Sequence, residues 1–502
     1  MSRSQNQSDQ FVVESEINNT VVVPVSNSIH QDEQRKKRRR GIGCERQEVE
    51  LISKMKLAIG EDDSIIPFEV NPFEELPSPG ALFPLLFRVL FTIARISTLC
   101  SISIIVLIYF LNLLSQKTND DKDIMFLLGS SYTLCSVSWG VILVSQSVRG
   151  TGSSVSRYIY ITFVTAFAPS VCLIGIYVVL YVFETSKLAR KLLLIVLLIL
   201  GSAGGAALCE YMFVKIIRTH PIFIASQNAK GASPKLSKWH AKRRVGIWKR
   251  SLLNGVPIFF ILGVLLIYVF GIMELNRNVS GFISMSVYCL ALLIKVAGSK
   301  YIIRIMTAMR TGRYYFDAIV FVFEYVTSLL LRVMMLSTSV EATSQTLAII
   351  NSLVELMVRN FLYNSYVVQG HGFPGWDSDR KKRFYFFGRG RVVDAGNDMI
   401  AEYVTSFTAA SVLLFLGPTN VFNLVNDPAI DLTRMVRVVT FQAVPNVLVD
   451  VYISYLETSG GLLHHFETFW VHVQLSVVLT KIFSVVFLTV LVLVVLVKSQ
   501  DV

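Results

Sequence analysis

After residue 80 the chain is a succession of long hydrophobic runs separated by short polar segments. An α-helix rises 1.5 Å per residue, so about 20 apolar residues cross the hydrocarbon core of a bilayer. The clearest run, residues 96–114, has no charged residue. Backbone polar groups in lipid must be satisfied within the segment, which restricts such runs to helices. The pattern therefore predicts an all-α fold, a polytopic transmembrane helical bundle.

Counting the runs predicts about eleven spans, with nine to eleven compatible because four runs of the second half contain charges. The first-half spans are expected at 96–114, 124–148, 158–183, 192–214, 251–273 and 279–294. The second-half spans are expected at 315–336, 347–368, 399–424, 438–456 and 473–497. A basic cytoplasmic connection, 299–314, joins the two transmembrane regions, 81–298 and 315–502.

Residues 1–80 differ from the rest, being rich in Ser, Asn, Gln and charge with little apolar periodicity. Such composition predicts a disordered tail, and the prolines around 69–84 predict an extended approach to the membrane. The densest basic cluster of the chain is Arg35, Lys36, Lys37, Arg38, Arg39 and Arg40. Contact with anionic lipid is the favoured interpretation; a sorting signal and nucleic-acid contact are the alternatives.

Loop charge orients the bundle, because cytoplasmic loops of membrane proteins are enriched in Lys and Arg. Residues 215–250 carry ten Lys or Arg and no acid, including the lipid-binding candidates Lys242, Arg243 and Arg244. The eleven-span arrangement places both this loop and the N-terminus in the cytoplasm. The next connection then lies outside, where Asn278 begins an Asn-Val-Ser glycosylation sequon.

The basic segment 369–398 is expected to be a further cytoplasmic linker. It contains Asp377-Ser378-Asp379, the spacing with which some glycosyltransferases bind a divalent cation, but no domain of the required size accompanies it. The six cysteines lack metal-ligand spacing, and no phosphate-binding loop is present. The sequence thus predicts no enzyme, no cofactor and no metal site.

Composition favours the membrane class over a nucleic-acid-binding one. Only 16% of residues are charged, against about 25% in soluble domains, and the mean hydropathy is +0.55. The net charge of +12 lies largely in the segments between hydrophobic runs, where topology and contact with anionic lipid account for it.

The second half contains a short repeated sequence. Glu-Tyr-Val-Thr-Ser begins at Glu324 and again at Glu402, a separation of 402 − 324 = 78 residues. At the same offset Met357-Val358-Arg359 returns as Met435-Val436-Arg437. These matches predict a parallel internal repeat, 315–368 with 393–446, in which each pentapeptide begins a span running outward from the cytoplasm.

Charges within these spans share helical faces. Steps of seven and eight place Asp317, Glu324 and Arg332 on one face, and Asn351, Glu355 and Arg359 follow one another at i, i+4. Ionisable groups inside a membrane mark either a pathway or an internal pair. The candidate pathway residues are Glu324, Tyr325, Arg332, Glu355, Arg359, Glu402, Tyr403, Asp450 and Lys481.

Two interpretations of these charges remain open. In the first they form internal ion pairs: Glu355 with Arg359, Glu324 with Arg332 or a neighbouring helix, and Asp450 with Lys481. In the second, Glu324 and Glu402 line a polar cavity, to which the hydroxyls of the pentapeptides contribute.

The favoured function is a transporter or channel that moves a small solute or ion without ATP hydrolysis. The alternatives are a membrane receptor or scaffold with structural intramembrane salt bridges, and a membrane-embedded enzyme acting on lipid or lipid-linked substrate. An enzyme would bring acid, base and metal ligands together at one depth. A receptor would have fully paired bridges and no cavity.

Overall fold

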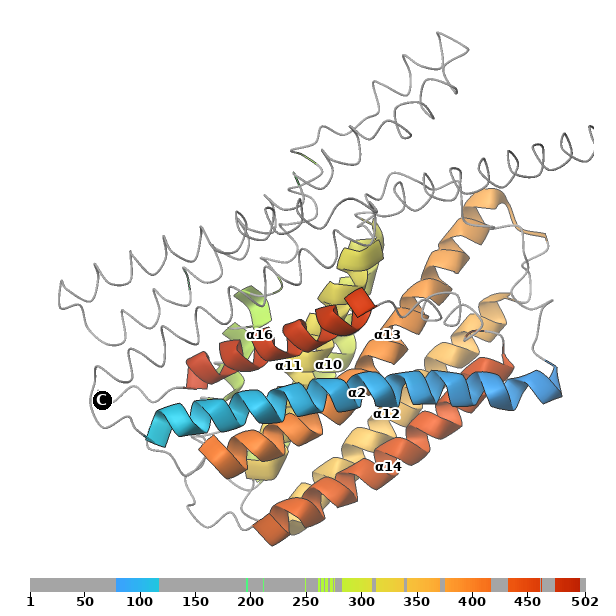
Figure 1. Ribbon diagram of the computed structural model, residues 1–502. Helices are drawn as coiled ribbons and strands as arrows, with labels where there is room; N and C mark the ends of the chain where they lie inside the picture. Colours follow the sequence, from blue (N-terminus) through green and yellow to red (C-terminus); the bar gives the residue numbers. More distant parts are fainter. Residues whose placement is uncertain are drawn as a thin grey trace, which may run out of the picture. The chain divides into compact units, whose positions relative to one another are not determined.

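The computed structural model describes residues 78–116, most of 261–275, 282–308, 313–337, 341–370, 375–416, 432–460 and 475–496, with residues 196, 211, 249 and 462. The helices of these ranges are α2 (Pro79–Gln116), α10 (Phe282–Ala308), α11 (Arg313–Ser337), α12 (Glu341–Gly370), α13 (Ser378–Ser411), η4 (Val412–Leu416), α14 (Leu432–Ser459) and α16 (Leu475–Leu496) (Figure 1). Outside the described residues lie the tail up to residue 77 with its basic cluster 35–40, the expected spans 124–148 and 158–183, nearly all of 192–214, residues 242–244 and Asn278.

Five described helices are long and apolar enough to cross a membrane. The candidate spans are Gly80–Leu113, Ile283–Ile305, Asp317–Leu336, Gly390–Leu416 and Val436–Ser459. They lie in α2, α10, α11, α13 continued by η4, and α14, and each overlaps a span expected from the sequence. The class predicted from hydropathy, an α-helical membrane protein, is confirmed for the described part of the chain.

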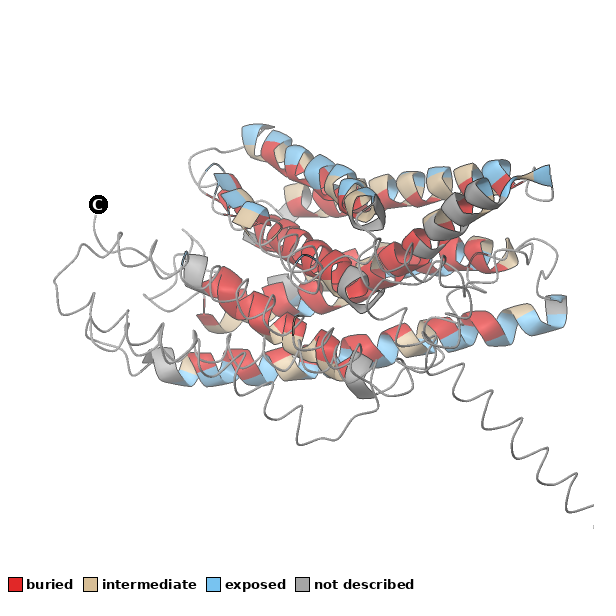
Figure 2. Cartoon of the chain, turned by 90° about the horizontal axis from the view of Figure 1, so that it is seen from above, coloured by how far each residue is buried: buried red, intermediate tan, exposed pale blue. Residues whose placement is uncertain are grey.

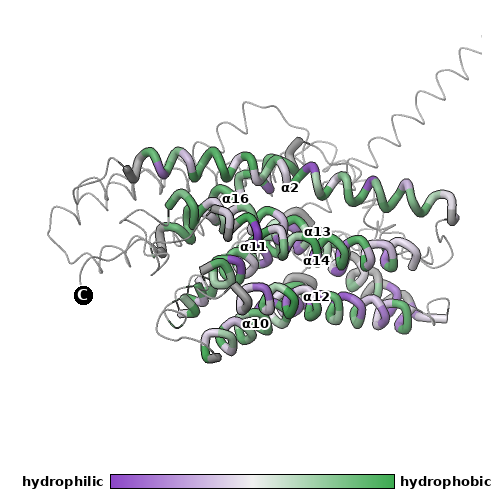
Figure 3. Tube along the Cα trace, turned by 90° about the horizontal axis from the view of Figure 1, so that it is seen from below, coloured by the Kyte–Doolittle hydropathy of each residue, from purple (hydrophilic) through white to green (hydrophobic). Residues whose placement is uncertain are grey.

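Helix α12 buries polar side chains and exposes apolar ones. On α12 the predicted stripe of Asn351, Glu355 and Arg359 is buried, whereas Met357 and Phe361 on other faces are 67% and 71% exposed. Figure 2 shows that the buried faces of the helices are turned towards neighbouring helices. Figure 3 shows that hydrophilic residues lie within the bundle as well as at the helix ends. Large exposed apolar side chains are stable against lipid tails, so this arrangement fits a bilayer.

Helix α11 is the most enclosed element of the described region. Every residue of its candidate span, Asp317–Leu336, is buried except Ala318. It packs most extensively against α13 and also against α10 and α16, while α12 packs against α14. Charged residues on α11 therefore face other helices on every side and need partners among them.

The prediction of an extended approach over 69–84 is wrong from residue 79 onward. Helix α2 begins at Pro79, well before the expected start of the first span at residue 96, and includes Pro84. Proline fits the first turn of a helix because the amide groups there have no intrahelical acceptor. Prolines near the start of an apolar run are thus compatible with a helix that begins among them.

A linker is expected over 369–398, but the segment is helical from residue 378 onward, and the candidate span Gly390–Leu416 includes its last nine residues. Asp377 is the N-cap of α13, and its side chain accepts a hydrogen bond from the backbone N–H of Arg380 at 3.1 Å. The role of Asp377 is thus helix capping. Similarly, α10 continues through Ala308, so the first ten residues of the expected connection 299–314 are helical.

Gly298 allows α10 and α11 to approach closely. A Cβ atom at this position would collide with the Phe323 ring of α11. We expect Gly298→Leu to lower the unfolding free energy by about 1–3 kcal/mol, the usual cost of overpacking. Thermal unfolding of the detergent-solubilised protein measures it. Gly271→Leu is the control, since the space around Gly271 is open; equal losses of stability in the two variants would show that the α10–α11 contact is not the cause.

Candidate functional site

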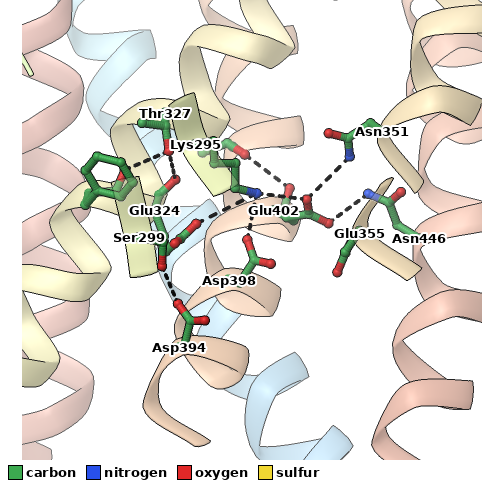
Figure 4. A network of polar contacts seen from close by, with 12 residues as sticks. Lys295, Ser299, Glu324, Thr327, Asn351, Glu355, Asp394, Asp398, Glu402 and Asn446 are labelled. Atoms are coloured by element: carbon green, nitrogen blue, oxygen red, sulfur yellow. Dashed lines mark hydrogen bonds and ion pairs between the residues drawn. The ribbon is translucent and has the colours of Figure 1, made fainter. Parts of the chain in front are cut away.

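Lys295 of α10 lies at the centre of a buried ionic network. Its Nζ is 2.7 Å from Asp398, 3.2 Å from Glu402 and 3.8 Å from Glu324. The first two carboxylates come from α13 and the third from α11, and Figure 4 shows Lys295 between them. One ammonium thus joins three helices. Lys295 follows the expected span 279–294 directly, yet its side chain is only 8% exposed.

Glu402 is surrounded by further donors. Asn446 of α14 donates to it at 3.0 Å and Asn351 of α12 at 3.5 Å. Arg332 of α11 approaches to 3.8 Å and donates to Gln442 of α14 at 3.2 Å. The Glu402 carboxylate therefore contacts side chains from α10, α11, α12 and α14, which makes it the most extensively partnered acid of the network.

Arg359 of α12 binds a second set of carboxylates. Its guanidinium lies 2.6 Å from Asp450, 3.3 Å from Glu457 and 3.4 Å from Glu355. The predicted Glu355–Arg359 pair is thus formed, and α14 supplies the other two acids. Tyr403 of α13 donates to Asp450 at 2.7 Å. This cluster fastens α12 and α13 to α14.

A cavity of about 50 Å³ lies between these clusters. A water molecule needs roughly 10–15 Å³ of such space, so the cavity has room for about three waters or one partly hydrated ion. The carboxylates that line it are Glu324, Glu355, Asp394, Asp398 and Glu402, and the bases are Lys295, Lys300, Arg359 and Arg391. Among the described residues the lining therefore comes from α10, α11, α12 and α13.

The cavity has a neutral pair at one side. Arg391 donates to Asp394 at 2.7 Å, one turn apart on α13. Ser299 of α10 donates to the other oxygen of Asp394 at 2.5 Å. Asp394 is therefore fully engaged, in contrast to Asp398 and Glu402, which lie one and two turns further along α13 and share the ammonium of Lys295.

Acids outnumber bases in the two central clusters. The carboxylates are Glu324, Glu355, Asp398, Glu402, Asp450 and Glu457, and the bases in contact with them are Lys295, Arg332 and Arg359. With every group ionised these nine described residues carry a formal charge of 3 − 6 = −3, and Lys300 of the cavity lining reduces it to −2. An uncompensated charge buried among helices is costly, so the arrangement favours an additional positive charge or bound protons.

A separate ion pair lies beyond the cavity. Lys481 of α16 is 3.2 Å from Asp317 and 2.5 Å from the side-chain oxygen of Asn397, and its Nζ lies 4.1 Å from the centre of the Phe321 ring. Asn397 in turn donates to Asp317 at 3.1 Å. The expected pairing of Asp450 with Lys481 is therefore wrong, since each binds a different partner.

The candidate pathway residues divide into three groups by position. Glu324, Glu355, Arg359 and Glu402 line the cavity. Arg332 and Asp450 contact those residues from outside the cavity, and Tyr403 donates a hydrogen bond to Asp450. Tyr325 and Lys481 lie elsewhere; Tyr325 is hydrogen-bonded to Thr408 and Thr489 at 3.2 and 2.7 Å.

The pentapeptide hydroxyls do not serve the cavity as expected. The Thr327 hydroxyl donates to the backbone carbonyl of Phe323, and those of Thr405 and Ser406 donate to the carbonyl of Glu402. Such bonds to the preceding turn satisfy the hydroxyl within its own helix. Glu324 and Glu402 also lie near the middle of their candidate spans rather than at the start.

The candidates predicted from the sequence omit two acids and three bases that line the cavity: Asp394, Asp398, Lys295, Lys300 and Arg391. The signal for the acids was present, because Asp394, Asp398 and Glu402 are spaced by four residues and share one face of a helix. Residues 380–391 are rich in Lys and Arg, so the segment was interpreted as a loop. Lys295 follows directly after an apolar run, where a charge ordinarily marks the end of a span.

Comparisons of the chain with protein-family models, with curated proteins and with solved structures found no match. Its class follows from its own helices: it is an α-helical membrane protein with a buried ionic network between its described helices.

Proposed function

We propose that this protein is a transporter or channel for a small solute or ion that works without ATP hydrolysis. The observation that carries the proposal is the cavity between α10, α11, α12 and α13, which is lined by charged side chains. Three of these helices, α10, α11 and α13, are long and apolar enough to cross a membrane. Charges within membrane helices are costly and are found mainly where they pair or line a path. The cavity is the proposed binding site of the solute.

The unequal numbers of acids and bases favour this function over a receptor or scaffold. A purely structural bridge is most stable when each charge meets an opposite one and every polar atom has a partner. Here six carboxylates share three bases, and a Glu355 oxygen that lines the cavity has no hydrogen-bond partner among the described residues. A site for a mobile positive charge accounts for both features.

The proposed orientation has the N-terminus in the cytoplasm. The ten Lys and Arg of residues 215–250 and the cluster at 35–40 then lie on the same side, where anionic lipids attract basic segments. The bilayer and its anionic lipids are the proposed partners. The proposal involves no catalytic chemistry by the protein.

Two variants test the proposal. In proteoliposomes with entrapped H⁺-, Na⁺-, K⁺- and Mn²⁺-sensitive dyes, we expect the wild type to conduct at least one of these ions. We expect Glu402→Gln and Glu324→Gln each to reduce that flux at least tenfold, because each removes a carboxylate that lines the cavity. Size-exclusion elution of the purified variants should remain that of the wild type.

Glu457→Gln is the matched control. It makes the same chemical change at an equally buried position, and Glu457 contacts Arg359 but does not itself line the cavity. Its flux should stay within about twofold of wild type. Wild-type flux through both cavity variants would overturn the proposal, and aggregation of both would favour the structural interpretation of the charges.

A further inference from the structure

Three carboxylates converge on one point of the cavity. Glu355 of α12 and Asp398 and Glu402 of α13 each present an oxygen, and these three oxygens lie within 4.8 Å of one another. Calcium binds oxygen at about 2.3–2.6 Å, so two ligands on opposite sides of one ion are separated by roughly 4.6–5.2 Å. A single cation can therefore contact all three. Figure 4 shows the three side chains around one space.

Glu355 provides a second, independent indication of a ligand. One of its carboxylate oxygens accepts from Arg359 at 3.4 Å, whereas the other is buried without a hydrogen-bond partner. The residue is only 8% exposed and lines the cavity. A buried carboxylate oxygen without a partner costs more than a satisfied one, and a cation in the cavity would satisfy it.

The chemistry of the lining determines the class of cation. The three convergent ligands are carboxylates, and none of the described lining residues is His or Cys. Carboxylate oxygens suit Mg²⁺, Ca²⁺ and Mn²⁺, whereas sulfur and imidazole favour zinc and copper. A divalent ion would offset two of the three excess negative charges of the central clusters.

We propose that Glu355, Asp398 and Glu402 bind a hard divalent cation, and that the Lys295 ammonium occupies part of this site when the cation is absent. Lys295 Nζ lies 2.7 Å from Asp398 and 3.2 Å from Glu402, two of the three ligands. Ammonium and metal repel each other at such distances. Lys295 therefore competes with the metal. The divalent cation would be the solute of the proposed transport function, and this role of the cavity rests on that function.

Binding of Mn²⁺ to the purified protein in detergent tests the site directly. The electron paramagnetic resonance signal of free Mn²⁺, titrated after removal of metal with EDTA, gives the affinity. We expect stoichiometric binding by the wild type, competition by Ca²⁺, and at least tenfold weaker binding by Asp398→Asn and Glu355→Gln. Glu457→Gln, the matched control, should bind within about threefold of wild type.

Lys295→Met gives the sharpest outcome, because its effect has the opposite sign. Removing the competing ammonium should raise Mn²⁺ affinity at least tenfold. The substitution also removes the partner of three carboxylates, so the variant is expected to be less stable in EDTA. Mn²⁺ should then raise its melting temperature by more than that of the wild type, since a ligand stabilises the state that binds it.

Other results would overturn the proposal. Absence of Mn²⁺ binding by the wild type, or equal losses in Asp398→Asn and Glu457→Gln, would exclude the site. A wild type stabilised by acidification from pH 7 to pH 5 but not by Mn²⁺ would show that protons neutralise the carboxylates. Because binding in detergent requires no flux, Mn²⁺ binding without flux would overturn only the transport proposal, and flux of another ion without Mn²⁺ binding only this one.

Discussion

Arg359→Met is expected to destabilise the protein so strongly that little of it is recovered folded. The Arg359 guanidinium holds Asp450, Glu457 and Glu355 at 2.6–3.4 Å, and its side chain is 4% exposed. Removing one partner of a buried ion pair costs about 3–5 kcal/mol, a large part of the 5–15 kcal/mol that stabilises a typical protein. Here one substitution deprives three carboxylates of the same base. Yield of the monodisperse protein and its melting temperature measure the loss.

Arg437→Met is the control for this prediction. Arg437 is the counterpart of Arg359 at the 78-residue offset, but it is exposed on α14, so its replacement should change stability by less than about 1 kcal/mol. Arg359→Lys should be intermediate, because an ammonium cannot contact several carboxylates as a planar guanidinium does. Adding Asp450→Asn and Glu457→Gln to Arg359→Met should recover stability. A wild-type melting temperature for Arg359→Met alone would show that the cluster is not structural.

The different surroundings of Arg359 and Arg437 show that the internal repeat is only partly reflected in the structure. Glu324 and Glu402 have a common environment, since both are buried and both contact Lys295. Arg359 is buried in the ionic network, whereas Arg437 lies exposed near the start of α14. The two repeat units thus have similar surroundings at Glu324 and Glu402 and different surroundings at Arg359 and Arg437.

Helical periodicity allowed part of the site to be predicted. The stripe of Asn351, Glu355 and Arg359 follows from a spacing of four residues, because 3.6 residues per turn place them on one face. That polar face has to avoid lipid, and it is buried in the bundle. The burial of this stripe follows from helix geometry and from the cost of exposing charge to hydrocarbon. Neither requires knowledge of the tertiary structure.

The partners of each charge could not be predicted from periodicity. Asp450 binds Arg359 and Lys481 binds Asp317 because α14 packs against α12 and α16 packs against α11. The order and rotation of helices in a bundle depend on packing between segments far apart in the sequence. Hydropathy also misplaced Asp398, because buried charges make a spanning segment resemble a loop.

The Lys481–Asp317 pair provides a test of what a neutral buried bridge contributes. We expect Lys481→Met to lower the unfolding free energy by about 3–5 kcal/mol, since Asp317 would keep its charge among packed helices without the ammonium. Replacing both residues, Lys481→Met with Asp317→Leu, should restore stability to within about 1 kcal/mol of wild type or above it, because apolar substitutes of similar size often equal a buried pair. Thermal unfolding of both variants and of Asp317→Leu completes the double-mutant cycle.

The same double-mutant cycle applied to Lys295 and Glu402 should give the opposite result, because the double variant there should not recover stability. Lys481 and Asp317 are one base and one acid, so removing both leaves no net charge behind. Lys295 and Glu402 belong to clusters with three excess acids, so Lys295→Met with Glu402→Leu should still leave Glu324 and Asp398 without their ammonium. We expect this second double variant to remain destabilised in EDTA. Full recovery of both double variants would mean that the cavity charges, like those of Lys481 and Asp317, form an ordinary structural pair.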